Sequence, residues 1–174
     1  MAAPEIPIEV DAATGAWSTD GLPMIYMPRH FFVNNHLAVE AALGEEVYAR
    51  QLYDAGHKSA WVWCEQEAAT HGLEGLAVFH HYMRRISQRG WGQFTVRSVD
   101  GESGAADVRL DHSVFVEHCG TDIGRKLCYM YAGWFAGSLE WVGQATGRAF
   151  TLTSREAQCR ANGAEHCLFE VRPA

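Results

Sequence analysis

The sequence lacks the basic excess of a nucleic-acid-binding protein. Its 174 residues include 14 Lys and Arg against 21 Asp and Glu, which gives a net charge of −7 at pH 7. Domains that bind duplex DNA or RNA usually present a basic face. The one compact basic group here is Arg84, Arg85 and Arg89, which we expect at the solvated edge of a helix. We therefore expect no direct contact with nucleic acid.

Long apolar runs and an export signal are also missing. No stretch approaches the ~20 apolar residues that a membrane-spanning helix requires. Residues 1–15 show no basic segment followed by an apolar one, as a signal peptide would have. The cysteines number five, an odd count that favours reduced thiols or metal ligands over a set of disulfides. These features predict a cytoplasmic protein that does not contact membranes.

Sequence motifs for catalysis are scarce. There is no Gly-x-Ser-x-Gly elbow, no phosphate-binding Gly-Lys-Ser/Thr loop, no His-Glu-x2-His helix and no dinucleotide-binding Gly-x-Gly-x2-Gly turn after a strand. Glu117, His118 and Cys119 could mimic a nucleophile with its base, but adjacent residues rarely converge to hydrogen-bond distance. We assign no catalytic residue, and a binding protein is favoured over an enzyme.

The composition is that of a globular protein with an ordinary core. Apolar residues make up 48% and charged residues 20%, and the length suits one domain or two small ones. Residues 1–20 are small, acidic and proline-containing, which predicts a flexible N-terminal tail. We expect residues 21–174 to form a single domain.

Helical periodicity dominates the first half of the chain. Asn34 or Asn35 can cap a first helix, and a second amphipathic stretch ends near Gly56. Two further stretches, residues 59–70 and 73–89, place their apolar residues at helical spacing. The pattern predicts a group of helices before any sheet.

Strands dominate the second half. Alternating residues at 94–99 and 108–114 on either side of a Gly-rich turn predict a β-hairpin. A helix is expected over residues 126–142, and a final strand pair over residues 151–157 and 168–171. Helices followed by mostly antiparallel strands indicate an α+β fold, with N-terminal helices packed on an antiparallel sheet.

Two glycines stand four residues apart in the expected helix 126–142. Gly133 and Gly137 share one face, which allows a neighbouring backbone to approach closely. That neighbour is either another helix of the same chain or a second copy of the protein, and the sequence leaves both open.

The last third of the chain carries the order Glu156-x2-Cys159-x3-Gly163-x3-Cys167-x-Phe169. A turn at Asn162-Gly163 can bring the two sulfurs to one point. With Cys128, three thiols and a carboxylate could complete a closed tetrahedral zinc shell, which stabilises a fold and does no chemistry. The alternative is that these cysteines are small buried apolar residues, which is our preferred interpretation for Cys64 and Cys119.

These residues together resemble the 4-vinyl reductase domain. The resemblance rests on Tyr-Asp-Ala-Gly at 53–56, Gly-Trp-Gly at 90–92, Cys128 and the C-terminal motif at 156–169, and it spans nearly the whole chain. This family includes the sensor domains of phenol- and toluene-responsive transcriptional activators. It shares its architecture with a vesicle-tethering subunit and its overall shape with nitric-oxide-sensing haem domains. The chain departs from the family pattern by a longer stretch between Cys128 and Glu156.

The resemblance implies a metal site, a ligand and a partner. By analogy with the sensor relatives, Cys128, Glu156, Cys159 and Cys167 would hold zinc in a C-terminal zinc-binding hairpin. A small hydrophobic or aromatic molecule would bind between the hairpin and the helices, and the protein would form a homodimer. No ATPase or DNA-binding module is visible, so the domain would act alone or through a partner protein.

Aromatic residues are frequent, with six Trp, six Tyr and eight Phe, and an aromatic lining with few polar groups suits a small-molecule cavity. On the resemblance, the ligand-binding candidates are Phe115, Tyr129, Trp134, His112, and one of His80 and His81. Adjacent positions on a helix point in different directions, so only one of His80 and His81 can face the interior. An aromatic core and a hydrogen-bonded core histidine are the competing interpretations.

Three other functions remain open from the sequence. The family name suggests an enzyme or accessory subunit in tetrapyrrole or aromatic metabolism. The vesicle-tethering relatives suggest an interaction scaffold without a ligand. The shape of the haem domains suggests gas sensing, with His80, His81 or His112 as an iron ligand, although no motif requires iron.

Overall fold

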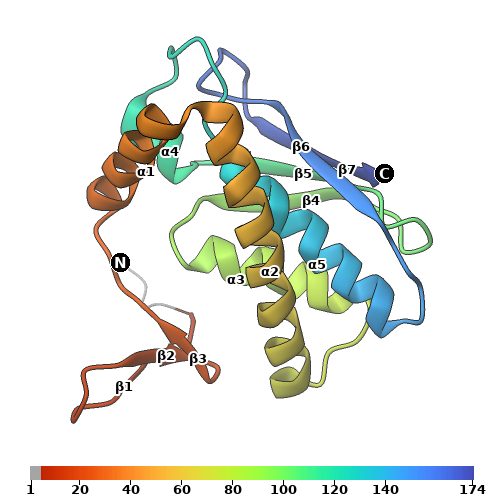
Figure 1. The fold of residues 1–174 in the computed structure, drawn as a ribbon. Helices are drawn as coiled ribbons and strands as arrows, with labels where there is room; N and C mark the ends of the chain where they lie inside the picture. Colours follow the sequence, from red (N-terminus) through yellow and green to blue (C-terminus); the bar gives the residue numbers. More distant parts are fainter. Residues whose placement is uncertain (1–4) are drawn as a thin grey trace.

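The central element of the fold is a four-stranded antiparallel sheet with strand order β4-β5-β7-β6 (Figure 1). The structure is a computed structural model and describes residues 5–174. The strands are β4 (Gln93–Val99), β5 (Ala106–Asp111), β6 (Leu152–Gln158) and β7 (Cys167–Pro173). Helices and antiparallel sheets together confirm the predicted α+β class.

The helices lie on one face of this sheet. Helices α3 and α5 contact the sheet directly, and α2 packs on α5 from the outside (Figure 1). The helical elements are α1 (Arg29–Leu43), α2 (Glu45–His71), α3 (Leu76–Gln88), α4 (Val114–Cys119), the 3-10 turn η1 (Tyr129–Tyr131) and α5 (Ala132–Ala145).

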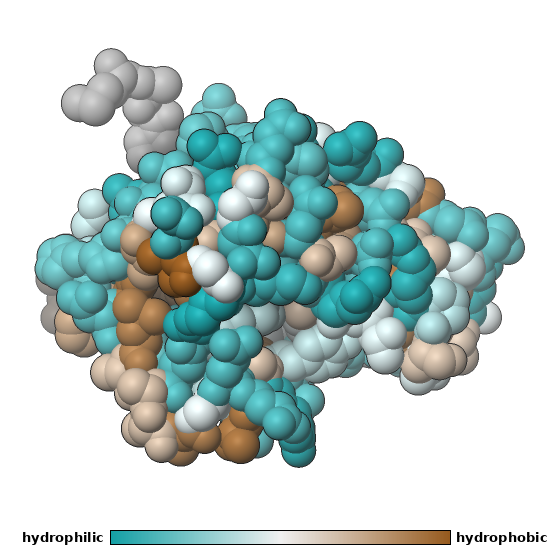
Figure 2. All heavy atoms as spheres, turned by 90° about the horizontal axis from the view of Figure 1, so that it is seen from above, coloured by the Kyte–Doolittle hydropathy of each residue, from teal (hydrophilic) through white to brown (hydrophobic). Residues whose placement is uncertain are grey.

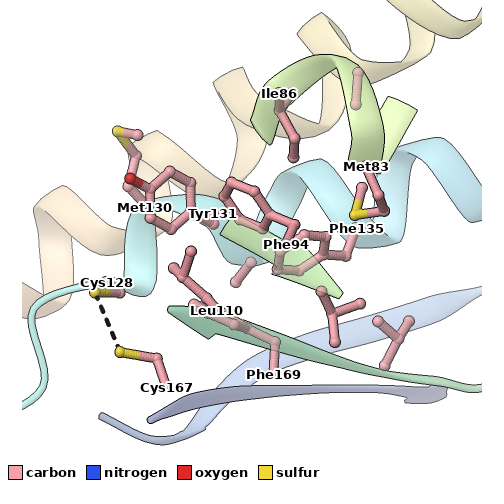
Figure 3. Packing of buried hydrophobic residues seen from close by; sticks show 14 of the residues in the cluster. Met83, Ile86, Phe94, Leu110, Cys128, Met130, Tyr131, Phe135, Cys167 and Phe169 are labelled. Atoms are coloured by element: carbon pink, nitrogen blue, oxygen red, sulfur yellow. Dashed lines mark hydrogen bonds between the residues drawn. The ribbon is translucent and has the colours of Figure 1, made fainter. Parts of the chain in front are cut away.

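The core lies between α5 and the sheet and is strongly aromatic (Figure 3). The ring centroids of Phe135 and Phe169 are 5.0 Å apart, and those of Phe94 and Tyr131 are 5.3 Å apart, both in edge-to-face geometry. Such pairs stabilise beyond their apolar burial alone. Cys128 and Cys167 lie at the edge of the same cluster (Figure 3), so this core and the cysteine motif form one packed unit.

The α2–α5 contact depends on three glycines. A Cβ atom at Gly133 would lie 2.1 Å from the carbonyl oxygen of Tyr53, and one at Gly137 would lie 2.4 Å from that of His57. A Cβ at Gly56 would lie 2.6 Å from the Trp134 ring. The close neighbour of Gly133 and Gly137 is therefore α2 of the same chain.

Two helix boundaries differ from the prediction. Helix α1 begins at Arg29 after Pro28, so Asn34 and Asn35 lie inside it and cap nothing. Helix α2 continues through Gly56 to His71. The glycine costs helix propensity, but it is needed there for packing against Trp134 and does not end the helix.

Two further boundaries differ in the second half. Strand β5 ends at Asp111, and His112 adopts a left-handed φ of 53°. Ser113 then caps α4, because its side chain accepts a hydrogen bond from the Phe115 N–H. The helix expected over 126–142 is shorter at its start, since η1 begins only after Cys128 and α5 begins at Ala132.

Part of the expected tail has secondary structure. Strands β1 (Glu9–Val10), β2 (Trp17–Thr19) and β3 (Leu22–Met24) form a small antiparallel sheet beside the helices (Figure 1). Residues 1–4 of the predicted tail lie outside the described residues. The flexibility of residues 1–20 stays a prediction.

The surface in Figure 2 is mostly hydrophilic, with hydrophobic residues in separate small areas. Within residues 5–174, no helix is both long and apolar enough to cross a membrane. This finding agrees with the absence of long apolar runs in the sequence.

Candidate metal centre and aromatic cleft

Four side chains of the C-terminal motif converge on one buried point. The ligand atoms of Cys128, Glu156, Cys159 and Cys167 all lie within 4.8 Å of one another. The sulfur of Cys167 is 3.7 Å from each of the other two sulfurs, and those two are 4.0 Å apart. A tetrahedral shell with Zn–S bonds of about 2.3 Å requires sulfurs about 3.8 Å apart. The three sulfurs therefore match the spacing of a single tetrahedral metal ion.

Local structure explains why these residues meet. Glu156 lies in β6, Cys159 directly follows that strand, and Cys167 begins β7. Between them, a tight turn forms two backbone hydrogen bonds to the carbonyl oxygen of Cys159, and Gly163 adopts a φ of 82°. Cys128 approaches from the segment before η1. A bound ion would thus join the strand pair to the helical layer.

Hydrogen bonds around the cluster orient its side chains. The Cys128 N–H donates to Oε2 of Glu156 at 3.0 Å, and the Arg160 N–H donates to the Cys167 sulfur at 3.3 Å. Oε1 of Glu156 is buried and has no hydrogen-bond partner among residues 5–174. A buried carboxylate oxygen without a partner is costly, so this atom is free to bind a cation.

The electrostatics of the cluster also favour a cation. Burial raises the pKa of the Cys128 thiol, and burial together with the charge of Cys159 raises the pKa of the Glu156 carboxyl to about 9. Hydrogen bonds from Cys128 and Cys167 lower the pKa of Cys159. Without a cation the cluster resists full ionisation, whereas a divalent ion would stabilise the thiolates. The residues present therefore fit a metal ion.

A second feature is a cleft of about 450 Å³ between α2, α3, β3 and the start of α5. Its walls are mainly aromatic and aliphatic, and its volume is in the range of small-molecule sites. The lining residues are Leu22, Pro23, Met24, Lys58, Ser59, Val62, Trp63, Tyr82, Ile86, Arg89, Trp91 and Trp134.

The predicted ligand-binding aromatics do not all meet in this cleft. Trp134 lines it. Phe115 and Tyr129 lie instead against the buried His36, with ring centroids 4.6 and 5.5 Å from the imidazole. The Tyr129 hydroxyl donates a short hydrogen bond to Glu40.

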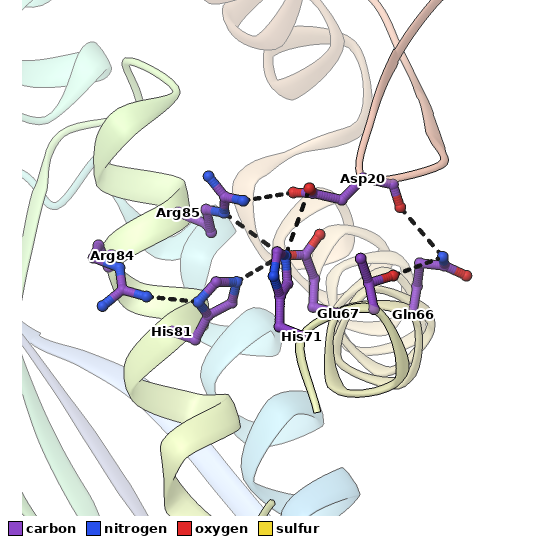
Figure 4. A network of polar contacts seen from close by, with 8 residues as sticks. Asp20, Gln66, Glu67, His71, His81, Arg84 and Arg85 are labelled. Atoms are coloured by element: carbon purple, nitrogen blue, oxygen red, sulfur yellow. Dashed lines mark hydrogen bonds and ion pairs between the residues drawn. The ribbon is translucent and has the colours of Figure 1, made fainter. Parts of the chain in front are cut away.

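The three predicted histidines occupy three different environments. His81 is buried and its Nε2 lies 2.6 Å from Oε2 of Glu67 (Figure 4). His80 is exposed and lines a separate groove. His112 is 79% exposed and lies 3.1 Å from Glu117. As predicted, only one of His80 and His81 faces the interior.

The buried polar cluster around His81 links the N-terminal sheet to the helices (Figure 4). Asp20, which follows β2, bonds Arg85 of α3 at 2.7 Å, and Arg85 lies 3.6 Å from Glu67 of α2. Glu67, His71 and His81 are close enough to hold an ion. The guanidinium of Arg85 already balances these carboxylates, so we interpret the cluster as an ion-pair network.

Several cleft residues escaped prediction. Trp63, Tyr82 and Trp91 come from three different segments, and no spacing in the sequence links them. Trp91 belongs to the Gly-Trp-Gly motif, which was the available signal. The basic group expected on the surface is partly buried: Arg85 is 7% exposed, and Arg89 lines the cleft.

Comparison of the sequence with family models assigns both halves of the chain. Residues 2–97 match a family described as a domain of unknown function (DUF5943). The chain belongs to this family. Residues 107–173 of the DUF5943 chain match the family model of the 4-vinyl reductase domain, which confirms the resemblance seen in the sequence. No protein with a curated description matches the sequence.

Solved structures share the fold at low sequence identity. The phenol-responsive sensory domain of the transcription activator PoxR, with phenol, has a TM-score of 0.79 at 16% identity, over 95% of this chain and 84% of the other. Trafficking protein particle complex subunit 3 from Naegleria fowleri, covalently bound to palmitic acid, gives 0.58 at 11% identity, over 84% and 95%. A vinyl-4-reductase family protein from Methanocaldococcus jannaschii gives 0.55 at 14%, over 87% and 84%.

Proposed function

We propose that this protein is a zinc-stabilised, sensor-type domain that binds a small hydrophobic or aromatic molecule. The observation that carries the proposal is the aromatic cleft beside Trp134, in a fold whose C-terminal hairpin gathers three thiols and a carboxylate. Ligand binding would be converted to output, directly or through a partner protein, by different affinity for two conformations.

Zinc is the metal that these donors favour. Three thiolates and one carboxylate give four ligands without an open position, which is typical of structural zinc. Cys128, Glu156, Cys159 and Cys167 would hold the ion, which would tie the hairpin to the helical layer. All five cysteines are unpaired, which supports a reducing compartment such as the cytoplasm.

An aromatic ligand is the proposed occupant of the cleft. Trp63, Trp91 and Trp134 offer ring faces and edges for stacking. The PoxR sensory domain, which has the same fold, is described with phenol bound. Neither Phe115, Tyr129 and the three histidines nor any other residue outside the cleft is needed for this binding mode.

The ligand proposal is tested by filling the cleft. Val62 lines the cleft on α2 and is 57% exposed, whereas Val47 lies on the same helix, 49% exposed and outside the cleft. Calorimetric titration with phenol and indole should detect binding to the wild type and to Val47→Trp. Binding to Val62→Trp should be at least about tenfold weaker because the added ring occupies the site. No binding of either probe to the wild type would refute a sensor role.

A second candidate function is protein assembly, including the expected homodimer. The N-terminal sheet and the segment after it expose several large apolar side chains, which is typical of interaction surfaces. These residues are Ile8, Val10, Trp17, Ile25, Tyr26 and Phe31. A role as an enzyme or accessory subunit is supported only by the fold of the vinyl-4-reductase family protein.

A further inference from the structure

Arg89 presents unused hydrogen-bond donors at the aromatic cleft. Its Nε and Nη2 atoms are buried and have no hydrogen-bond partner in the described part of the chain. The guanidinium carbon lies 5.1 Å from the centre of the Trp63 ring, and the buried Nε1 of Trp63 is likewise without a partner. Buried donors of this kind are costly unless an acceptor meets them.

The charge of the cleft is positive although the chain is acidic. Lys58 and Arg89 line it, and among residues 5–174 no Asp or Glu does. The nearest carboxylates are already engaged, since Asp20 bonds Arg85 at 2.7 Å and Glu67 lies 2.6 Å from His81. Arginine stays protonated even when burial lowers its pKa, as it does for Arg89. The cleft therefore lacks a negative partner for its own cation.

We infer that the cleft binds an aromatic carboxylate. The planar guanidinium of Arg89 would form paired hydrogen bonds with the two carboxylate oxygens. The ring of the ligand would lie against Trp91 and Trp134. The Trp63 indole N–H supplies one more donor. This inference rests on the proposed function, that the cleft is a ligand site, and adds the charge and chemical class of the ligand.

The direct test compares two ligands of the same shape. Benzoate and benzamide differ in charge and in their ability to pair with a guanidinium, but hardly in size. Calorimetric titration of the full chain at pH 7 should give benzoate an affinity at least about tenfold higher than benzamide, as a charge-assisted pair provides. Raising the salt concentration should weaken benzoate more than benzamide.

Variants assign the effect to Arg89. Arg89→Met keeps the apolar stem and removes the donors, and it should abolish the preference for benzoate while leaving benzamide within about twofold. Arg97→Met is the matched control, because Arg97 is exposed on β4. If Arg89→Met does not fold, Trp63→Phe removes a single donor and should weaken benzoate several-fold.

The outcomes separate this inference from the proposed function. Equal binding of benzoate and benzamide, with phenol or indole also bound, would overturn the carboxylate and leave the ligand site intact. An unchanged preference for benzoate in folded Arg89→Met would overturn the role of Arg89. Absence of binding by all four probes would overturn both proposals.

Discussion

At the scale of single residues, the cysteine sulfurs give the sharpest prediction. Cys167→Ser should release the metal, because a serine hydroxyl is a poor substitute for a thiolate ligand. We expect insoluble protein or a loss of more than about 4 kcal/mol of unfolding free energy, in the range that loss of a structural metal can reach. Urea denaturation and metal content measure the two effects.

The control for this change is Cys119→Ser. Cys119 is partly buried and lies outside the cluster, so its substitution should leave both metal content and stability nearly unchanged. Equal stability of Cys167→Ser and the wild type would show that the cluster holds no structural ion.

His81 predicts a pH dependence of stability. Burial, followed by the charges of Arg85 and Arg84, lowers the pKa of His81 to about 4. The unfolded chain takes up this proton near pH 6.5, so stability that is present above pH 6.5 is lost as the pH falls towards 4. Between pH 7 and pH 5 the wild type should lose on the order of 1–2 kcal/mol that His81→Gln does not lose.

The comparison between the two proteins isolates this effect. Burial raises the pKa of Glu67, and Asp20 adds to that shift, so Glu67 opposes the change in both proteins. Chemical denaturation at several pH values provides the measurement. Parallel curves for the wild type and His81→Gln would contradict the prediction.

At the scale of elements, the contact between α2 and α5 is the most sensitive to added volume. Gly137→Ala would place a methyl group 2.4 Å from the backbone carbonyl oxygen of His57. The helices would have to separate, and we expect a loss of about 2–3 kcal/mol despite the better helix propensity of alanine. Gln144→Ala, at an exposed position of α5, should have little effect. Thermal unfolding of both variants decides the point.

The order of elements could be predicted from periodicity, but several boundaries could not. Local patterns located the helices, the hairpin and the final strand pair. The continuation of α2 through Gly56 depends on Trp134, which lies far away in the sequence. The turn after β5 depends on the left-handed conformation of His112 and on the cap formed by Ser113. Both features come from tertiary contacts or single-residue geometry, which periodicity does not report.

The metal cluster and the cleft differ in the same way. Glu156, Cys159 and Cys167 are close in sequence, so their spacing revealed the site. The cleft is assembled from β3, α2, α3 and α5, and the expected solvated position of Arg89 was wrong. A charged residue on a helix has no local mark that shows whether it faces solvent or a cleft.

At the scale of the whole molecule, the exposed apolar residues near the N-terminus predict self-association. Ile25 is 78% and Tyr26 85% exposed, more than any other large apolar residue of the described chain. A homodimer that covers this surface should dissociate more readily in an Ile25→Ser, Tyr26→Ser variant, by about tenfold or more. Val47→Ser, on α2, is the control. Sedimentation equilibrium showing a wild-type monomer at high concentration would contradict this prediction.

The metal content of the purified chain tests the proposed architecture most directly. Elemental analysis, combined with native mass spectrometry, should find one zinc ion per chain and five reduced thiols. The same purification of a Cys159→Ser, Cys167→Ser variant should yield none. Absence of metal from the wild type, or iron with a coloured cofactor, would contradict a zinc-stabilised domain.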